Sequence, residues 1–101
     1  MLLKITPDEP PGTFRLEGEA DMSTEDLLLS TLEEARRNGH PIVLDLSGLT
    51  FLDSSGLRVF LRVAASLDPA QPLVLRSLTP SVRRVFDLSL PGGVPGIRIE
   101  D

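Results

Sequence analysis

The stretch 41-PIVLDLSGLTFLDSSGLRVFLRV-63 contains two apolar runs with different spacing. Residues 41–46 are nearly all apolar, which is typical of a strand that is buried on both faces. From Asp53 onward, apolar residues recur at helical spacing until about Leu67. The stretch therefore predicts a central strand, a connecting loop over residues 45–56, and a helix that begins at Asp53 or Ser54.

The rest of the chain alternates strands with helices around that centre. Strands are predicted over residues 2–6, 13–18, 73–76 and 97–99, and helices over residues 22–38 and 79–90. Right-handed crossovers between such strands produce a largely parallel sheet, and the Pro/Gly-rich connection after the first strand favours an antiparallel hairpin. We therefore expect a single α/β domain over residues 1–101, with a mixed, mostly parallel sheet of about five strands, an opening hairpin and helices packed on the sheet.

Charge and composition exclude several classes of function. The chain has 101 residues, with 10 Lys and Arg against 15 Asp and Glu, and its net charge of −5 repels nucleic acid and anionic lipid. Cysteine is absent, which excludes disulfides and thiolate metal sites. No apolar stretch has the length of a signal peptide core or a membrane span. We expect a cytoplasmic monomer that binds no nucleic acid, membrane, metal or cofactor.

Two predicted loops are expected to meet at one edge of the sheet. If the strands over residues 13–18 and 41–46 are parallel, their carboxyl ends share the edge at which α/β proteins commonly place functional residues. The loops that follow these strands are 18-GEADMS-23 and 45-DLSGLTFLDSSG-56. We therefore expect an acidic, serine-bearing surface made of Glu19, Asp21, Asp53, Ser54 and Ser55.

These serines are poor candidates for a catalytic nucleophile. Such a serine needs a general base, and the only histidine, His40, precedes the central strand, about 15 to 20 Å from Ser54 and Ser55. The nucleophile elbow G-x-S-x-G and the glycine-rich nucleotide loops are absent. Asp45 and Asp53 lack a third ligand for a metal ion. The sequence therefore predicts no catalytic residue, and we expect the protein not to be an enzyme.

Two interpretations of 53-DSSG-56 remain open on the residues alone. Asp and Ser are preferred helix caps, so the tetrapeptide can serve only to start a helix. A serine hydroxyl at that position can also accept a phosphate. The helix that follows has a wide apolar girdle and a polar stripe of Arg58, Arg62 and Ser66. The girdle either packs within the protein or forms a docking strip for a partner.

Three segments of the chain carry a family resemblance: 18-GEAD-21, 43-VLDLSGLTFLDSSGLRVFL-61 and 79-TPSVRRVFDLSL-90. In their order and spacing they resemble the STAS domain of anti-sigma factor antagonists, small bacterial proteins that switch partners with a serine-kinase anti-sigma factor. The resemblance spans most of the chain. It implies that Ser54, directly after Asp53, is the serine that the kinase phosphorylates. Ser55 takes the place of the neighbouring Ser or Thr, and Gly56 that of the motif glycine.

The resemblance also implies a partner-switching function. The unphosphorylated protein is expected to bind the kinase and free a sigma factor, and phosphorylation of Ser54 is expected to release the kinase until a phosphatase removes the phosphate. The residues expected to contact the partner are Glu19, Asp21, Ser23, Asp53, Ser54, Arg58 and Arg62. Those expected around the phosphate are Asp53, Ser55, Gly56 and Arg58. The alternatives are a STAS-type scaffold or interaction module of a sensor assembly, and an enzyme or small-molecule binder with a pocket at residues 47–55.

The chain departs from the family pattern at three places. Ala20 stands where members commonly have a branched apolar residue, and Arg58 stands where they often have glycine. The chain ends at Asp101, just after the last predicted strand, whereas members usually continue into a further helix. Arg58 lies one helical turn past Ser54, so we expect it either to pair with a phosphate there or to alter how a kinase approaches.

Overall fold

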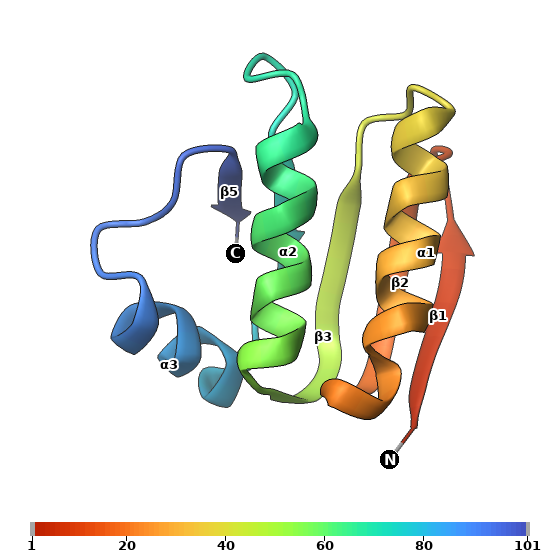
Figure 1. Cartoon of the computed structure of the whole chain (residues 1–101). Coiled ribbons are helices and arrows are strands. Elements are labelled where there is room, and N and C mark those ends of the chain that lie inside the picture. The colour runs from red at the N-terminus through yellow and green to blue at the C-terminus, as the bar shows by residue number, and fades with distance from the viewer. Residues whose placement is uncertain (1, 101) are drawn as a thin grey trace.

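Five strands form one mixed sheet in the order β1-β2-β3-β4-β5, and helices connect them (Figure 1). The computed structural model describes residues 2–100. The elements are β1 (Leu3–Asp8), β2 (Thr13–Ala20), the short 3-10 helix η1 (Met22–Thr24), α1 (Glu25–Arg37), β3 (Val43–Leu52), α2 (Ser54–Ser66), β4 (Leu73–Arg76), α3 (Pro80–Ser89) and β5 (Ile97–Glu100). β1 pairs with β2 antiparallel, and the later neighbours pair in parallel. The predicted α/β fold with an opening hairpin is confirmed.

In Figure 1, α1 and α2 lie over the strands on one face of the sheet, and α3 lies on the same side, next to the start of α2 and below β5. Right-handed crossovers that step from strand to strand in one direction return each helix over that face. The core between the two layers consists mainly of leucine and valine, and Phe60 of α2 stacks on Phe86 of α3 with 6.4 Å between ring centroids. Within residues 2–100, no helix is long and apolar enough to cross a membrane.

The apolar girdle of α2 packs inside the protein. Val59, Phe60 and Val63 are buried in the core that the helix forms with the sheet and its neighbours. Arg58 and Arg62 are exposed on the outer side of the helix, as the polar stripe predicted. The girdle is therefore used for folding, and its interpretation as a docking strip is wrong.

The opposite face of the sheet, within residues 2–100, carries charged side chains. Arg15 lies 4.0 Å from the carboxylate of Asp45 across the β2–β3 pair, and Arg76 donates to Glu100 at 2.9 Å across the β4–β5 pair. The N–H of Ser47, together with the nearby Arg15 charge, holds the pKa of Asp45 below its ordinary value. Exposed ion pairs of this kind each contribute little to stability.

The central strand is longer than the sequence predicted. Residues 47–52, which were expected in the connecting loop, continue β3 as far as Leu52. β2 likewise extends to Ala20, so Glu19 lies in a strand and not in a loop. As a consequence, Asp53 alone separates β3 from α2.

Bulges allow β3 to continue past Ser47. Along β2 the residue paired with Asp45 is Arg15, whereas the residue paired with Gly48 is Glu17, so β3 accommodates one extra residue between the two pairs. The N–H of Ser47 donates to the carboxylate of Asp45 at 2.9 Å and shapes the first bulge. A Cβ on Gly48 would lie 2.8 Å from Cγ of Glu17, so glycine permits the close approach of the strands. What resembles a turn in the sequence is therefore a strand bulge.

Candidate functional site

The carboxyl ends of β2 and β3 lie side by side at one edge of the sheet, where α1 and α2 begin (the lower edge in Figure 1). Ala20 pairs with Leu52 at the end of the two strands, and the N–H of Asp53 donates to the Ala20 carbonyl at 3.1 Å. We call this edge, with residues 19–24 and 51–58, the serine edge. The structure thus brings together the two segments that the sequence predicted to meet.

The turn after β3 consists of an aspartate cap followed by two serines. Asp53 is the N-cap of α2, and one of its carboxylate oxygens accepts the N–H of Ser55 at 2.8 Å and that of Gly56 at 3.2 Å. The carbonyl of Asp53 accepts the N–H of Leu57 at 3.0 Å. These bonds satisfy amides that a helix start leaves unpaired, which explains why α2 begins at Ser54.

Gly56 allows the start of α2 to lie directly against the end of β2. A Cβ at this position would lie 2.8 Å from the carbonyl oxygen of Ala20, 2.9 Å from Cβ of Ala20 and 2.6 Å from Cδ1 of Leu52. The small side chain of Ala20 belongs to the same contact. The motif glycine therefore has a packing reason that only the neighbouring strand reveals.

The turn after β2 has the same kind of cap, but its hydroxyls are bonded internally. Asp21 caps η1, and one carboxylate oxygen accepts the N–H of Ser23 at 2.9 Å and its hydroxyl at 2.6 Å. The hydroxyl of Thr24 accepts the N–H of Asp21 at 3.0 Å and donates to the carbonyl of Glu19 at 3.0 Å. The hydrogen bond from the Ser23 hydroxyl, supported by backbone N–H groups, lowers the pKa of Asp21. The hydroxyls of Ser23 and Thr24 are thus bonded within the turn, and we call it the closed turn, in contrast to the open turn after β3.

The serines after β3 have a different environment from Ser23. Within residues 2–100, the hydroxyls of Ser54 and Ser55 make no hydrogen bond. Ser54 is exposed at the first position of α2, and Ser55 is half-buried. Among the serines predicted at this edge, Ser54 therefore offers an exposed hydroxyl that nothing else in the described chain uses.

The predicted acidic surface is only partly present. Asp21 is 8% exposed and its carboxylate faces Ser23, so the expectation that it is exposed is wrong. Glu19 is half-buried in β2, and its Oε2 is shielded from solvent without a hydrogen-bond partner among residues 2–100. Asp53 is half-buried and occupied as a cap. The sequence could not predict how deeply these carboxylates are buried, because their burial depends on contacts with the neighbouring turn.

Exposed apolar side chains at the same edge were missed by sequence reasoning. Met22 in η1 is 77% exposed, and Phe51 near the end of β3 is 45% exposed. Leu2 is exposed as well, and its carbonyl accepts the N–H of Glu19, which places it beside the end of β2. Single exposed apolar residues are ordinary, but several on one edge indicate an interaction surface. The exposure of Phe51 could have been predicted from a strand that continues to Leu52, because neighbouring side chains of a strand point to opposite faces and Leu52 is buried.

The groups that would suggest an enzyme lie apart from the serine edge. His40 precedes β3 and Ser54 follows it, so the 10 residues of the strand separate them by about 30 Å, and the expected distance of about 15 to 20 Å was too short because β3 is longer than predicted. Asp45 lies in the first half of β3, away from Asp53. Within residues 2–100, no group of three or more His, Asp or Glu side chains is placed to hold a metal ion.

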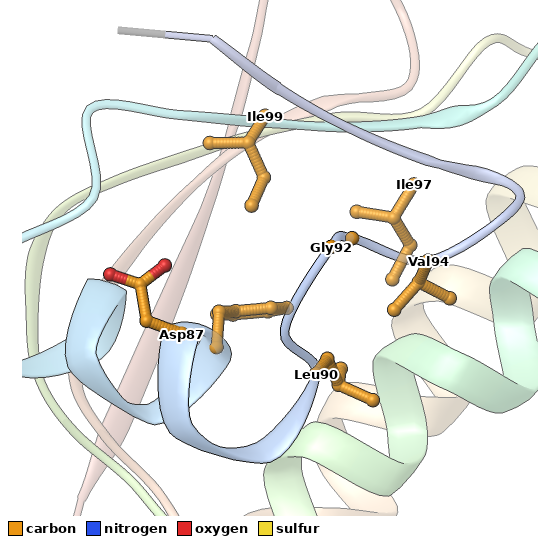
Figure 2. A pocket seen from close by; sticks show the side chains of 8 residues that line it. Asp87, Leu90, Gly92, Val94, Ile97 and Ile99 are labelled. Atoms are coloured by element: carbon orange, nitrogen blue, oxygen red, sulfur yellow. The ribbon is translucent and has the colours of Figure 1, made fainter.

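Two cavities in the surface also lie away from the serine edge. One of about 190 Å³ lies between the end of α3 and β5, and Figure 2 shows the side chains around it: Asp87, Leu90, Val94, Ile97 and Ile99. The other, of about 230 Å³, lies beside His40 at the opposite edge of the sheet. Neither is lined by residues 47–55, where the small-molecule alternative placed its pocket, and residues 47–52 are in β3.

Comparison with known proteins agrees with this architecture. The family model described as Mlab, STAS domain matches residues 5–90. The anti-sigma F factor antagonist of Paenibacillus polymyxa is 38% identical over 94 residues, which cover 88% of this chain and 80% of that protein. The protein BtrV of Bordetella bronchiseptica is 36% identical over 91 residues, which cover 86% of this chain and 78% of BtrV.

Among solved structures, an anti-sigma factor antagonist from Mycobacterium paratuberculosis matches with a TM-score of 0.79. The identity is 24%, and the match covers 87% of this chain and 78% of that chain. At this identity the structural match supports the fold, while the family model and the relatives support the membership. The chain belongs to the STAS-domain family of anti-sigma factor antagonists.

Proposed function

We propose that this protein is an anti-sigma factor antagonist that switches partners through Ser54. Unphosphorylated, it binds a serine-kinase anti-sigma factor at the serine edge and so frees a sigma factor for transcription. Phosphorylation of Ser54 releases the kinase, and a phosphatase restores the hydroxyl. The observation that carries the proposal is the exposed Ser54 hydroxyl at the start of α2, which is unbonded within residues 2–100.

The relatives support the class of partner. The protein from Paenibacillus polymyxa is named for antagonism of an anti-sigma factor, and it aligns with 88% of this chain. An anti-sigma factor is therefore the first partner to test. The exposed Ser54 hydroxyl supports the further proposal that this partner is a kinase, and reversal of the switch then requires a phosphatase.

The proposed docking surface combines apolar and polar residues of the serine edge with Arg62, which lies one helical turn farther along α2. Met22 and Phe51 provide exposed apolar area of the kind that forms the centre of protein interfaces. The polar residues assigned to this surface are Glu19, Asp21, Ser23, Asp53, Ser54, Arg58 and Arg62. Asp21 contributes through the shape of its turn, because its side chain is buried.

Phosphorylation acts on this surface through charge. Transfer of the γ-phosphoryl group of ATP to Oγ of Ser54 releases ADP and a proton and adds about −1.5 to −2 charges. The phosphate lies beside the carboxylate of Asp53 and on the same edge as Met22 and Phe51. A partner packed there would have to desolvate the phosphate, which is costly without a matching cation. The amides of Ser55 and Gly56 stay bonded to Asp53, so the proposed switch requires no change of fold.

In this proposal the kinase and the phosphatase catalyse the addition and removal of the phosphate, and this chain catalyses neither step. The separation of His40 from Ser54 by the length of β3 supports that assignment. Because sigma factors act with RNA polymerase, the proposed site of action is the cytoplasm.

The test combines phosphorylation with binding. The full chain is incubated with ATP and a purified serine-kinase anti-sigma factor of the same organism, and peptides are analysed by mass spectrometry. We expect phosphate on Ser54 and none on Ser23, whose hydroxyl is bonded to Asp21. The Ser54→Asp variant should bind that partner about tenfold more weakly than the wild type, a loss of roughly 1.4 kcal/mol.

The matched control is Ser54→Ala, which should bind the partner as the wild type does but should stay unmodified. Phosphate found only at another residue, or wild-type affinity of Ser54→Asp, would contradict the proposal.

A further inference from the structure

Ser54 and Arg58 lie one above the other on the outer side of α2. Residues four apart on a helix have Cβ atoms about 5 to 6 Å apart, within reach of a long guanidinium side chain. Both residues are exposed. Within residues 2–100, Arg58 makes no hydrogen bond or ion pair, so no internal partner competes for its guanidinium.

The backbone at the start of α2 offers little to a phosphate on Ser54. The N–H groups of Ser55 and Gly56 donate to the carboxylate of Asp53 at 2.8 and 3.2 Å, and that of Leu57 donates to the Asp53 carbonyl at 3.0 Å. Amides that usually bind anions at a helix start are therefore already occupied. The Asp53 carboxylate next to Ser54 also repels a second anion. A cation on a side chain is needed to compensate.

We propose that Arg58 binds the phosphate of phospho-Ser54 within the same chain. The planar guanidinium carries a positive charge and can donate two parallel hydrogen bonds to the oxygens of a phosphate monoester. This inference rests on the proposed function only for the source of the phosphate.

The pairing makes phosphorylation change two groups of the serine edge at once. It adds the phosphate, and it withdraws from the surface the free cation that Arg58 presents in the unphosphorylated protein. A partner that uses an acidic group against Arg58 then loses that contact and meets an anion in its place.

The experiment does not need the kinase. Phosphoserine is incorporated at position 54 during translation, and the second pKa of the phosphate, about 6 in an unperturbed phosphoserine, is measured by phosphorus NMR in the full-length protein. Arg58→Gln should raise this pKa by about half a pH unit relative to the wild type, because an exposed ion pair stabilises the dianion by a fraction of a kcal/mol. Arg58→Lys should keep most of the effect.

The matched control is Arg62→Gln, which removes the same charge one turn farther from Ser54 and should leave the pKa within about 0.2 unit of the wild-type value. Circular dichroism verifies that each variant is folded. Equal pKa values in the wild type and in Arg58→Gln, or an equal shift in Arg62→Gln, would overturn the inference. If the pKa shift appears but no kinase modifies Ser54, the proposed function fails and the pairing stands.

Discussion

The turns after β2 and β3 have the same chemical plan but present their hydroxyls differently. Both begin with an aspartate cap and continue with hydroxyl residues, in 21-DMST-24 and 53-DSSG-56. The hydroxyls of Ser23 and Thr24 are bonded within the first turn, whereas those of Ser54 and Ser55 are unbonded within residues 2–100. An aspartate cap followed by hydroxyl residues therefore does not by itself decide whether a serine hydroxyl is available for modification; the hydrogen bonds within each turn do.

Part of the difference originates at the third residue after each cap. In the first turn this residue is Thr24, whose hydroxyl accepts a hydrogen bond from the N–H of Asp21 and completes a capping box. In the second turn it is Gly56, which has no side chain that could accept this hydrogen bond, and the N–H of Asp53 donates to the carbonyl of Ala20 instead. The contact with β2 that requires glycine thus also leaves the second turn open.

The largest expected effect comes from closing the space at Gly56. In Gly56→Ala the new Cβ would meet the backbone carbonyl of Ala20 at 2.8 Å, and backbone cannot move aside cheaply. This overpacking should lower the free energy of unfolding by about 2 kcal/mol, more than the gain in helix propensity. Urea denaturation measures the change. Ala65→Leu, on the exposed side of α2, should stay within about 0.5 kcal/mol of the wild type; an equal loss in both variants would contradict the packing role of Gly56.

The second prediction tests whether Met22 in the closed turn contacts the partner, as opposed to any exposed apolar residue. Met22→Ser should weaken binding to the anti-sigma factor about tenfold, roughly 1.4 kcal/mol, because an apolar contact of the proposed interface is lost. Leu88→Ser is the matched control, since Leu88 is 76% exposed and Met22 77% exposed, but Leu88 lies on α3. Calorimetric titration of both variants checks this. Equal affinities would remove Met22 from the docking surface.

A smaller effect is expected when the cap of the open turn is removed. Asp53→Ala leaves the amides of Ser55 and Gly56 without their acceptor and should cost about 1 kcal/mol of folding stability. Asp53→Asn should be nearly as stable as the wild type, because an amide oxygen caps almost as well. Chemical denaturation distinguishes the two. If Asn destabilises as much as Ala, the charge of Asp53 matters more than its hydrogen bonds.

The smallest effect concerns the closed turn in acid. The pKa of Asp21 is lowered in the folded protein, so its contribution to stability is present above its unfolded value, about 3.9, and is lost as the pH falls through the lower folded value. Ser23→Ala removes the main cause and should raise the pKa of Asp21 toward the ordinary value. Titration of the carboxyl carbon by NMR measures it. The stability difference between the variant and the wild type should narrow on acidification, and a constant difference would contradict this linkage.

Patterns within short windows predicted most of the fold. The spacing of apolar residues from Leu57 to Val63 predicted α2 with its exposed arginines, and Asp53 predicted where it begins. The predicted length of β3 was too short, because Ser47-Gly48 resembles a turn when the partner strand is not known. Their bulge exists because Glu17 of β2 pairs with Gly48, and no local pattern encodes that pairing.

The sequence by itself determined the order of strands and helices and the place of Ser54 at the start of a helix. These depend on apolar spacing and capping, which act between residues a few positions apart. Only the tertiary structure decided that Asp21 is buried and that Met22 and Phe51 share an edge with Ser54. The position of Met22 near Ser54 follows from the parallel pairing of β2 with β3, which joins segments that are separated in the chain by the whole of α1.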